Sequence, residues 1–423
     1  MESPRRPSSI DLPDLHFSIR EPFLDRERAR RILHSEGLEA LVVSEGRNVF
    51  HATQFYPLLE RMSLRGTTLA VIPQDPARPV ALVMPAFSYY YILADEGLLP
   101  GVQPFLFTPP GASADPASFP LTYRLAGEQV PAREQVRRAA IEAAAPYSLG
   151  LEQALTRALR ELGITRGRVG YDEASLSTRL AAAAPALTPI SAEDTPRRIR
   201  LVRSPAEIRM MTLASKANIE AAHATLAVAR ELGSLRSIRQ RFFAEAALRG
   251  NTGVFMVVNG SSSEVYDEPL REGSAFLIDC VSQLRQFHGD YGRTVFVGDP
   301  TPRMRYCTEA MAKVWAEMQP KIRPGMRFSE VRTLGASLLK QFHLDAPVVF
   351  SPHSVGLAHT DQPRTTLDGR PLDVEIEANM ILSIDCPLFE TGMGGTAHLE
   401  DLVLVTPHGA VPIHDTGTPT YTI

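Results

Sequence analysis

Four carboxylates lie in two β-rich segments of the chain, spaced so that each segment can bring two of them together. The first segment, FLIDCVSQLRQFHGDYGRTVFVG, contains Asp279 and Asp290. Its two apolar runs are separated by a short polar stretch, a pattern that predicts a β-hairpin. A hairpin folded about Leu284-Arg285 would place Asp279 directly opposite Asp290.

The second segment, MILSIDCPLFETGMGGTAHLEDLVLV, contains Asp385 and Glu400. A chain reversal about Gly392-Met393, in the glycine-rich turn, would place these two side chains directly opposite each other. Opposed side chains have their Cβ atoms ~4.5–5.5 Å apart, and like charges at that separation are destabilising. Two such pairs in apolar strands therefore predict a bound cation, and His353 in SPHSVGLAHTDQP supplies a nitrogen ligand.

Four segments, in their order along the chain, resemble the motifs of the pita-bread-fold metallohydrolases: LIDCVSQLRQFHGDYGRT, HSVGL, NMILSID and HLEDLVLVTPHG. This family includes methionine aminopeptidase, aminopeptidase P, prolidase and the metal-free relative creatinase. RLVRSPAEIRMMTLASKANIEAA resembles the helix that opens the family's catalytic domain, and ARRILHSEGLEALVVSEGRNVFHATQF resembles the start of the creatinase-type N-terminal domain. The resemblance covers nearly the whole chain. It implies an α+β protein in which an α/β creatinase-like N-terminal domain precedes a pita-bread catalytic domain.

The resemblance also implies a site for two divalent metal ions, held by Asp279, Asp290, His353, Asp385 and Glu400. Asp290 and Glu400 would bridge the two ions. Carboxylates with one imidazole suit Mn²⁺, Fe²⁺, Co²⁺ or Zn²⁺. Two ions ~3.5–4 Å apart can hold a hydroxide between them and polarise the carbonyl that the hydroxide attacks.

Composition, patterning and the resemblance together predict three parts of the chain. Residues 1–19 form a polar, proline-bearing tail. Residues 20–198, the creatinase-like domain, alternate strand-like runs (EALVVSE, TTLAVIP, PVALVMP) with helical ones, which is typical of an α/β domain. Residues 199–423 form the predicted pita-bread metallohydrolase domain.

Two helices of the catalytic domain have clear sequence signals. Ser204 and Glu207 form a predicted capping box, with Pro205 at the first helical position. The apolar face of this helix continues until Gly233, where we expect the helix to end. A later helix is expected to begin at about Ser329.

Four positions depart from the pattern of the peptidases in this family. Asp385 stands where they carry a longer glutamate, and Asp267 occupies the place of a histidine near their substrate. Their second histidine follows the metal-binding one by seven residues, whereas His359 follows His353 by six. His398 replaces an arginine of the prolidase-like members. We expect His359, His398 and Asp267 to take part in catalysis, with His359 as a general acid or base.

Three functions are compatible with these residues. The first is a metallohydrolase that cleaves amide bonds as Xaa-Pro aminopeptidases or dipeptidases do. The second is a metal-dependent lyase or hydrolase of a small non-peptide metabolite. The dimethylsulfoniopropionate lyases of this fold resemble the chain here, because their base, a carboxylate, also lies six residues after the ligand histidine. The third, a non-catalytic binding protein, would not need a chelating set of residues.

Asp267 bears on the choice between the first two functions. A carboxylate beside the reacting carbonyl would disfavour the oxyanion formed in peptide cleavage, and it would favour a cationic substrate. From this placement we expect weak Xaa-Pro cleavage and better activity on a small substrate.

The bulk properties favour a water-soluble cytoplasmic enzyme. The 423 residues include 44 Lys and Arg against 48 Asp and Glu, a balance that argues against nucleic-acid or anionic-membrane partners. The first residues lack the apolar core of a signal peptide, and no stretch approaches the ~20 apolar residues of a membrane span. Three cysteines are too few for a disulfide framework, and Cys280 and Cys386 are expected to be core thiols. The resemblance implies a homodimer acting on a short peptide or small molecule.

Overall fold

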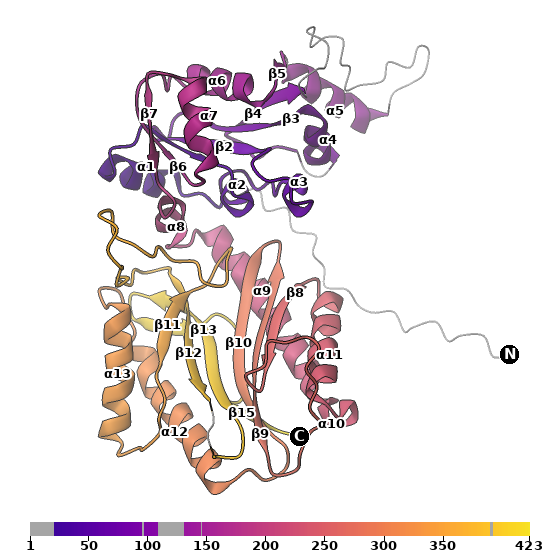
Figure 1. Cartoon of the computed structure of the whole chain (residues 1–423), viewed down its shortest axis with the longest axis vertical. Coiled ribbons are helices and arrows are strands. Elements are labelled where there is room, and N and C mark those ends of the chain that lie inside the picture. Colours follow the sequence, from indigo (N-terminus) through magenta and orange to yellow (C-terminus); the bar gives the residue numbers. More distant parts are fainter. Residues whose placement is uncertain (1–20, 95–96, 109–130, 145, 390–391) are drawn as a thin grey trace, which may run out of the picture. The chain divides into compact units, whose positions relative to one another are not determined.

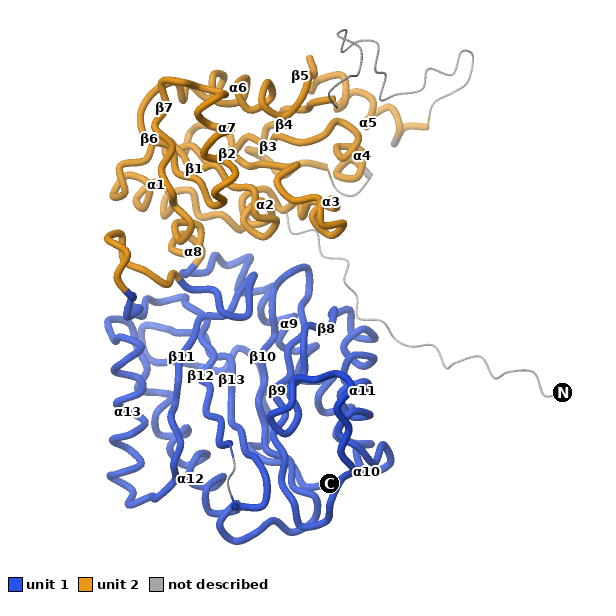
Figure 2. The backbone as a smooth tube through the Cα atoms, viewed as in Figure 1, with its two compact units in different colours: residues 1–17, 201–362, 371–423 blue, residues 18–200, 363–370 orange. Residues whose placement is uncertain are grey.

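The structure is a computed structural model that describes residues 21–94, 97–108, 131–144, 146–389 and 392–423. The described residues form two compact units (Figure 2). Of the described residues, the N-terminal unit contains those from 21 to 200 together with the segment 363–370, and the C-terminal unit contains those in 201–362 and 371–423. The predicted tail, 1–19, lies outside the described residues. The return of 363–370 to the N-terminal unit was not anticipated from the sequence.

The N-terminal unit is built on a seven-stranded mixed sheet with the strand order β5-β4-β3-β2-β1-β6-β7 (Figure 1). Two apolar clusters lie within it, and the strands contribute alternating side chains to each. Its strands are β1 (Ala40–Val43), β2 (Leu69–Pro73), β3 (Val80–Pro85), β4 (Val102–Thr108), β5 (Ser148–Leu149), β6 (Gly167–Tyr171) and β7 (Leu187–Ser191). Its helices are α1 (Arg26–Ser35), α2 (Gly46–Thr53), α3 (Leu58–Arg61), α4 (Ala86–Ala94), α5 (Ala132–Ala143), α6 (Leu151–Glu161), α7 (Ser175–Ala183) and α8 (Thr195–Arg200).

The C-terminal unit is built on an eight-stranded sheet with the order β11-β12-β13-β10-β9-β8, to which β14 adds on β13 and β15 on β10. Its strands are β8 (Thr252–Val258), β9 (Ala275–Leu284), β10 (Phe287–Phe296), β11 (Ser351–Ser354), β12 (Ile381–Leu388), β13 (Ala397–Thr406), β14 (Gly409–Pro412) and β15 (Thr420–Thr422). Its helices are α9 (Pro205–Leu226), α10 (Ala229–Leu232), α11 (Leu235–Leu248), α12 (Pro302–Met318), the short 3₁₀ helix η2 (Gln319–Lys321) and α13 (Phe328–Gln341).

The helices of the C-terminal unit pack against the two halves of its sheet. Helices α9 and α11 contact β8, β9 and β10, and helices α12 and α13 contact β13 and β11 (Figure 1). Cys280 and Cys386 are fully buried in the two apolar clusters that these helices form with the strands. Both cysteines are free, which confirms their prediction as core thiols. Because side chains alternate along a strand, the residues next to them, Asp279 and Asp385, face the other side of the sheet.

The helix that opens this unit begins as predicted but ends earlier. Ser204 and Glu207 form the capping box of α9. The helix ends at Leu226, and the prediction that it would continue to Gly233 was wrong. Val228 leaves the helical conformation, and a separate turn, α10, then ends at Gly233 with a left-handed φ of 71°. The later helix, α13, was expected from about Ser329 and begins one residue before it.

The β9–β10 hairpin forms, but its register differs from the prediction. Arg285 and Gln286 have φ values of 47° and 75° and form the turn, so Leu284 pairs with Phe287. Backbone with φ > 0 at both central residues is the conformation of the tight two-residue hairpin turn. Asp279 therefore lies opposite Gly292 rather than opposite Asp290. The shift is two residues, so both aspartates still share one face of the sheet as diagonal neighbours.

The β12–β13 hairpin has the predicted register, with Asp385 directly opposite Glu400. Glu400 also pairs with Gly292 of the neighbouring strand β10. The four carboxylates are thus carried by four adjacent strands and lie on the same face. Among the described helices, none combines the length and the apolar character that crossing a membrane requires.

Candidate metal centre

The face of the sheet opposite the helices gathers the predicted carboxylates. Asp290 and Glu400 are almost completely buried, at 1% and 2% exposed. Asp279 is partly buried, and Asp385, the residue nearest solvent, keeps 36% of its side chain exposed. The strands β9, β10, β12 and β13 hold these side chains in fixed positions, since each strand is paired on both sides.

Two histidines approach the carboxylates from β11 and from the loop that follows it. His353 lies on β11, opposite Ser383 of β12, and its Nε2 is 3.6 Å from Oδ2 of Asp290 and 3.4 Å from Oε1 of Glu400. The Nε2 atom of His359 is 3.3 Å from the same Oδ2 of Asp290. The ring centroids of the two histidines are 4.8 Å apart. The spacing of six residues therefore brings His359 to the site, as expected.

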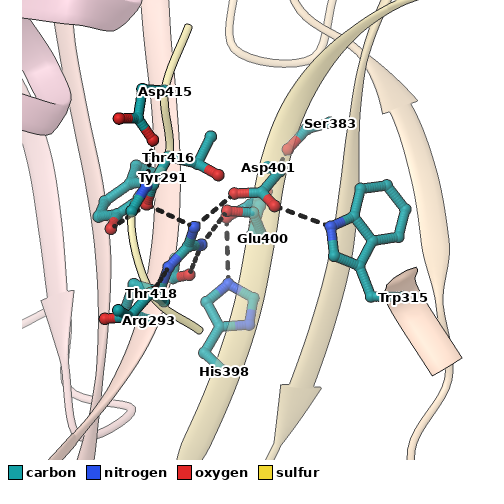
Figure 3. A network of polar contacts seen from close by, with 12 residues as sticks. Tyr291, Arg293, Trp315, Ser383, His398, Glu400, Asp401, Asp415, Thr416 and Thr418 are labelled. Carbon is teal, nitrogen blue, oxygen red and sulfur yellow. Dashed lines mark hydrogen bonds and ion pairs between the residues drawn. The ribbon is translucent and has the colours of Figure 1, made fainter. Parts of the chain in front are cut away.

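A third histidine reaches the cluster from β13. The Nε2 atom of His398 is 3.1 Å from Oε2 of Glu400 (Figure 3). The same atom is 3.4 Å from Oδ1 of Asp385. The donor atoms of the cluster form three groups in which all atoms lie within 4.8 Å of one another. The groups are Asp290–His353–His359, Asp279–His398–Glu400 and His353–Asp385–Glu400.

Several polar atoms of the cluster have no hydrogen-bond partner in the protein. They are buried and comprise Oδ1 of Asp279, both carboxylate oxygens of Asp290, and the Nδ1 atoms of His353 and His398. Buried polar atoms are almost always paired, so each unpaired one calls for an explanation. Carboxylate oxygens and imidazole nitrogens in a converging set are the donors that divalent metals use, and the residues present fit such ions.

The aspartates show the electrostatic cost of the cluster most clearly. Burial, followed by the nearby charge of Glu400, raises the pKa of Asp279 and of Asp290 well above the usual value. Burial would raise the pKa of Glu400 as well, but the hydrogen bonds with His353 and His398 outweigh it, and this pKa lies well below its usual value. Without a cation, the four carboxylates cannot all be ionised at neutral pH at low energetic cost.

The histidines complement these carboxylates. Burial alone would lower the pKa of His398, but the hydrogen bond to Glu400 and the charges around it raise the pKa to about 9. The pKa of His353 is also raised, because Glu400 and Asp290 outweigh its burial. A metal ion must compete with these protons, so binding should release them.

Ser383 was not identified from the sequence. Its hydroxyl donates a hydrogen bond of 2.6 Å to Oε1 of Glu400. Ser383 precedes Asp385 by two residues and therefore shares its face of β12. That alternation was the available signal, but serine at a strand position is too common to be singled out by it.

On the opposite face of β13, Asp401 is held by a separate network (Figure 3). Arg293 donates from Nη2 to Oδ1 of Asp401 over 2.6 Å, and Trp315 donates from Nε1 to Oδ2 over 2.8 Å. The same guanidinium donates to the carbonyl oxygen of Glu400. This network fixes the backbone of β13 at the residue that faces the metal cluster.

Asp267 is the predicted site residue that the structure does not bring to the cluster. Its exposed carboxylate accepts hydrogen bonds from the Arg236 backbone N–H at 3.2 Å and from Ser234, at the start of α11. It belongs to none of the three donor groups. Counting residues along an irregular connection between β8 and β9 did not locate it. The expectation of a cationic substrate, which rested on Asp267, loses its basis.

Comparisons with known proteins agree with this architecture. Residues 205–407 match the model of metallopeptidase family M24. The "Probable dipeptidase PepE" of Mycobacterium tuberculosis is 26% identical over 237 residues, which cover 54% of this chain and 62% of that relative. The match therefore spans less than two thirds of the relative's length.

Solved structures share the fold over almost the whole chain. An Xaa-Pro dipeptidase from Bacillus anthracis superposes with a TM-score of 0.67 at 15% identity, covering 94% of this chain and 99% of the other. The prolidase from Pyrococcus furiosus gives 0.62 at 16% identity, covering 92% and 99%. Dipeptidase PepE from Mycobacterium ulcerans gives 0.63 at 19% identity, covering 94% and 96%. The predicted fold, a pita-bread domain preceded by a creatinase-like domain, is confirmed.

Proposed function

We propose that this protein, whose residues 205–407 match the model of metallopeptidase family M24, is a metal-dependent hydrolase of the Xaa-Pro dipeptidase or aminopeptidase kind. Similar proteins include a probable dipeptidase and several Xaa-Pro peptidases, which supports this choice of substrate. One observation carries the proposal. Carboxylate oxygens that accept no hydrogen bond converge with imidazole nitrogens on a single buried face of the sheet.

In this proposal, two divalent ions (Mn²⁺, Co²⁺, Zn²⁺ or Fe²⁺) are held by Asp279, Asp290, His353, Asp385 and Glu400. Such ions supply a water whose pKa is lowered toward ~7 and a Lewis acid that polarises the scissile carbonyl. The protein's part is to fix the donor positions. Asp290 and Glu400 lie centrally among the donor atoms, and each is within reach of a histidine on β11.

His359 is the group best placed to move a proton. About a third of its side chain is exposed, so it lies on the open side of the cluster, with Nε2 3.3 Å from Asp290. Phe255 packs edge-on against the ring at 5.2 Å between centroids, and Nδ1 lies 3.2 Å from the Thr360 hydroxyl. Nε2 can thus hand a proton to the departing amine. His398, buried beneath Asp385, takes part through Glu400.

The test is a substrate panel on protein reconstituted separately with each of the four metals. Xaa-Pro dipeptides, longer Xaa-Pro peptides and dipeptides without proline separate a dipeptidase from an aminopeptidase. We expect hydrolysis of Xaa-Pro bonds that is lost in His353→Ala. His408→Ala is the matched control, because His408 is exposed in the β13–β14 turn and should leave turnover unchanged. Undiminished hydrolysis by His353→Ala would contradict the proposal.

A lyase or hydrolase of a small metabolite is the second candidate, and the position of His359 favours it. A general acid or base 3.3 Å from Asp290 could equally abstract a proton from a small substrate. A panel of small amides, sulfonium compounds and betaines tests this alternative with the same protein samples. In either case His359→Ala should lower kcat by ~10²–10⁴-fold, the usual contribution of a general acid–base group.

Location and assembly complete the proposal. We propose a cytoplasmic protein, which is supported by the three cysteines, all of them free and buried. We also propose a homodimer. Light scattering of the purified protein measures the second point, and cell fractionation measures the first. A monomer across the micromolar range would contradict the dimer.

A further inference from the structure

Gly292 leaves an open position in the middle of the carboxylate face. It pairs with Asp279 on one side and with Glu400 on the other. Gly292 shares the face of Asp290, because the two are separated by two residues on β10. A side chain at this position would stand among the carboxylates. Since glycine has none, the space above its Cα is available to a neighbour.

The ring of His398 fills that space. A Cβ added at Gly292 would overlap Cδ2 and Nε2 of His398 and come 2.8 Å from the Cβ of Glu400. The backbone N–H and carbonyl of His398 both form hydrogen bonds with the Thr294 side chain. Its N–H donates to Oγ1 of Thr294 over 2.9 Å, and its carbonyl accepts from the same hydroxyl over 3.0 Å. The ring is therefore held across Gly292 and is 2% exposed.

Among the residues that the structure describes, the polar contacts of the His398 ring are made by Nε2, and all are with carboxylates. Nε2 lies 3.1 Å from Oε2 of Glu400 and 3.4 Å from Oδ1 of Asp385, and it forms a donor group with Asp279 and Glu400. Nδ1 is buried without a hydrogen-bond partner. The ring thus presents one nitrogen to the carboxylates of the cluster.

We propose that His398 is a sixth protein ligand of the metal centre, coordinating through Nε2 the ion that Asp279 and Glu400 share. The inference rests on the proposed function only in requiring that metal ions occupy this cluster. His353, Asp385 and Glu400 form the corresponding donor group for the other ion. Each ion would then have one imidazole nitrogen, and Gly292 is the residue that makes room for the second.

The arginine that the prolidase-like members carry at the position of His398 could not play this role. A guanidinium is always protonated in proteins and offers no lone pair, whereas a neutral imidazole does. A second nitrogen also favours Co²⁺, Zn²⁺ or Fe²⁺ over Mn²⁺, which prefers oxygen ligands. His398 thereby adds a donor beside Asp385, whose side chain is shorter by one methylene than the glutamate of the peptidases.

Cobalt binding provides a test that does not depend on turnover. The apoprotein is titrated with Co²⁺ against a chelating dye to obtain two affinities, and the loaded protein is studied by proton NMR in water. Each imidazole bound to Co²⁺ through Nε2 gives one strongly shifted, exchangeable Nδ1–H resonance. We expect His398→Ala to lose one such resonance, distinct from the one lost in His353→Ala. The same variant should bind one of the two Co²⁺ ions at least ~100-fold more weakly. That loss exceeds the one caused by removing a typical outer-shell partner.

Two further variants sharpen the test. Gly292→Ala forces the His398 ring aside and should lose the same resonance and the same affinity as His398→Ala. His398→Arg should lack both as well. His408→Ala should keep every resonance. If wild-type protein binds two Co²⁺ ions but His398→Ala retains all shifted resonances, the sixth-ligand inference is overturned and the proposed function stands. If wild-type protein binds no Co²⁺, the proposed function itself fails.

Discussion

Glu400 and Asp401 are adjacent on β13, and yet they occupy opposite kinds of environment (Figure 3). Asp401 faces the helices, and both of its oxygens are paired, with Arg293 at 2.6 Å and with Trp315 at 2.8 Å. Glu400 accepts from Ser383 and contacts His398, but it faces other carboxylates across the sheet. Its neighbour Asp290 has two buried oxygens with no hydrogen bond at all.

The contrast distinguishes a carboxylate that serves the fold from one that serves a ligand. A buried charge with a fixed cation and hydrogen bonds is compensated within the protein, and removing either partner exposes the other's desolvation cost. In the facing set, three histidines and Ser383 compensate only part of the charge, and oxygens of Asp279 and Asp290 keep no hydrogen-bond partner. Asp290 should therefore matter little for folding and greatly for activity, and Asp401 should show the reverse.

The largest effect is expected for Asp290→Ala. Removal of this central donor should lower turnover by far more than the ~10–100-fold typical of an outer-shell partner. The apoprotein should be no less stable, because a buried like charge has been removed. Steady-state kinetics and thermal unfolding of the metal-free protein measure the two quantities. If Asp290→Ala unfolds more easily than the wild type but retains activity, then Asp290 serves the fold rather than a ligand, which contradicts the comparison.

Asp401→Ala is the counterpart on the other face. It leaves the buried guanidinium of Arg293 without its carboxylate, and breaking a buried pair typically costs ~3–5 kcal/mol of unfolding free energy. Denaturant unfolding gives the value. Asp299→Ala is the control, since Asp299 forms an exposed pair with Arg305 and should cost at most ~1 kcal/mol. Equal losses in both variants would show that the Arg293 pair has no special role.

The pH dependence of the apoprotein is a third test. Asp279 and Asp290 have raised pKa values, and that of His398 is raised to about 9. Each of these groups binds its proton more tightly in the folded state, so its contribution is complete at low pH and is lost as the pH rises through the folded pKa. The unfolding free energy should fall between about pH 6.5 and 9, by ~1.4 kcal/mol per pH unit for each proton involved.

Saturating metal should flatten this slope, because the bound ions replace the protons as the neutralising charge. Parallel denaturant titrations of metal-free and loaded protein across that range measure the difference. A metal-free protein that becomes more stable toward pH 9 would contradict the electrostatic account of the cluster.

The smallest effect is expected at Asp385. Its side chain is partly exposed and one methylene shorter than a glutamate, so one ion should be held more loosely than the other. Asp385→Glu should raise the affinity of the looser ion by ~10-fold, about 1.4 kcal/mol. Calorimetric titration resolves the two affinities. Asp368→Glu, a change at an exposed loop aspartate, is the control and should alter neither affinity. Equal, tight binding of both ions by the wild type would contradict the expectation that one ion is held more loosely.

The alternation of apolar and polar residues was enough to predict the hairpins and the shared face of the carboxylates. It was not enough for the register of β9–β10. The turn residues Arg285 and Gln286 adopt the left-handed backbone conformation although neither is glycine or asparagine. The residue types therefore did not indicate the position of the turn. The predicted register was wrong by two residues. Because side chains alternate along a strand, an error of two leaves Asp279 and Asp290 on the same face of the sheet.

Positions outside regular strands were harder to predict. The structure places His359 beside Asp290, because a short loop after β11 limits where its side chain can go. Asp267 was not, because the long connection after β8 carries it to the start of α11. The closeness of His398 to Gly292 depends on contacts between strands that are more than a hundred residues apart in sequence, and local patterns do not encode such contacts.

The most direct test of the account is the metal content of the protein. Wild-type protein and Asp290→Ala are incubated with Co²⁺ or Zn²⁺, passed through a desalting column and analysed for bound metal per chain and for melting temperature. We predict up to two ions per wild-type chain, with a clear rise in melting temperature, and a loss of at least one ion in the variant. Wild-type protein with no retained metal and an unchanged melting temperature would contradict the claim that these carboxylates exist to hold ions.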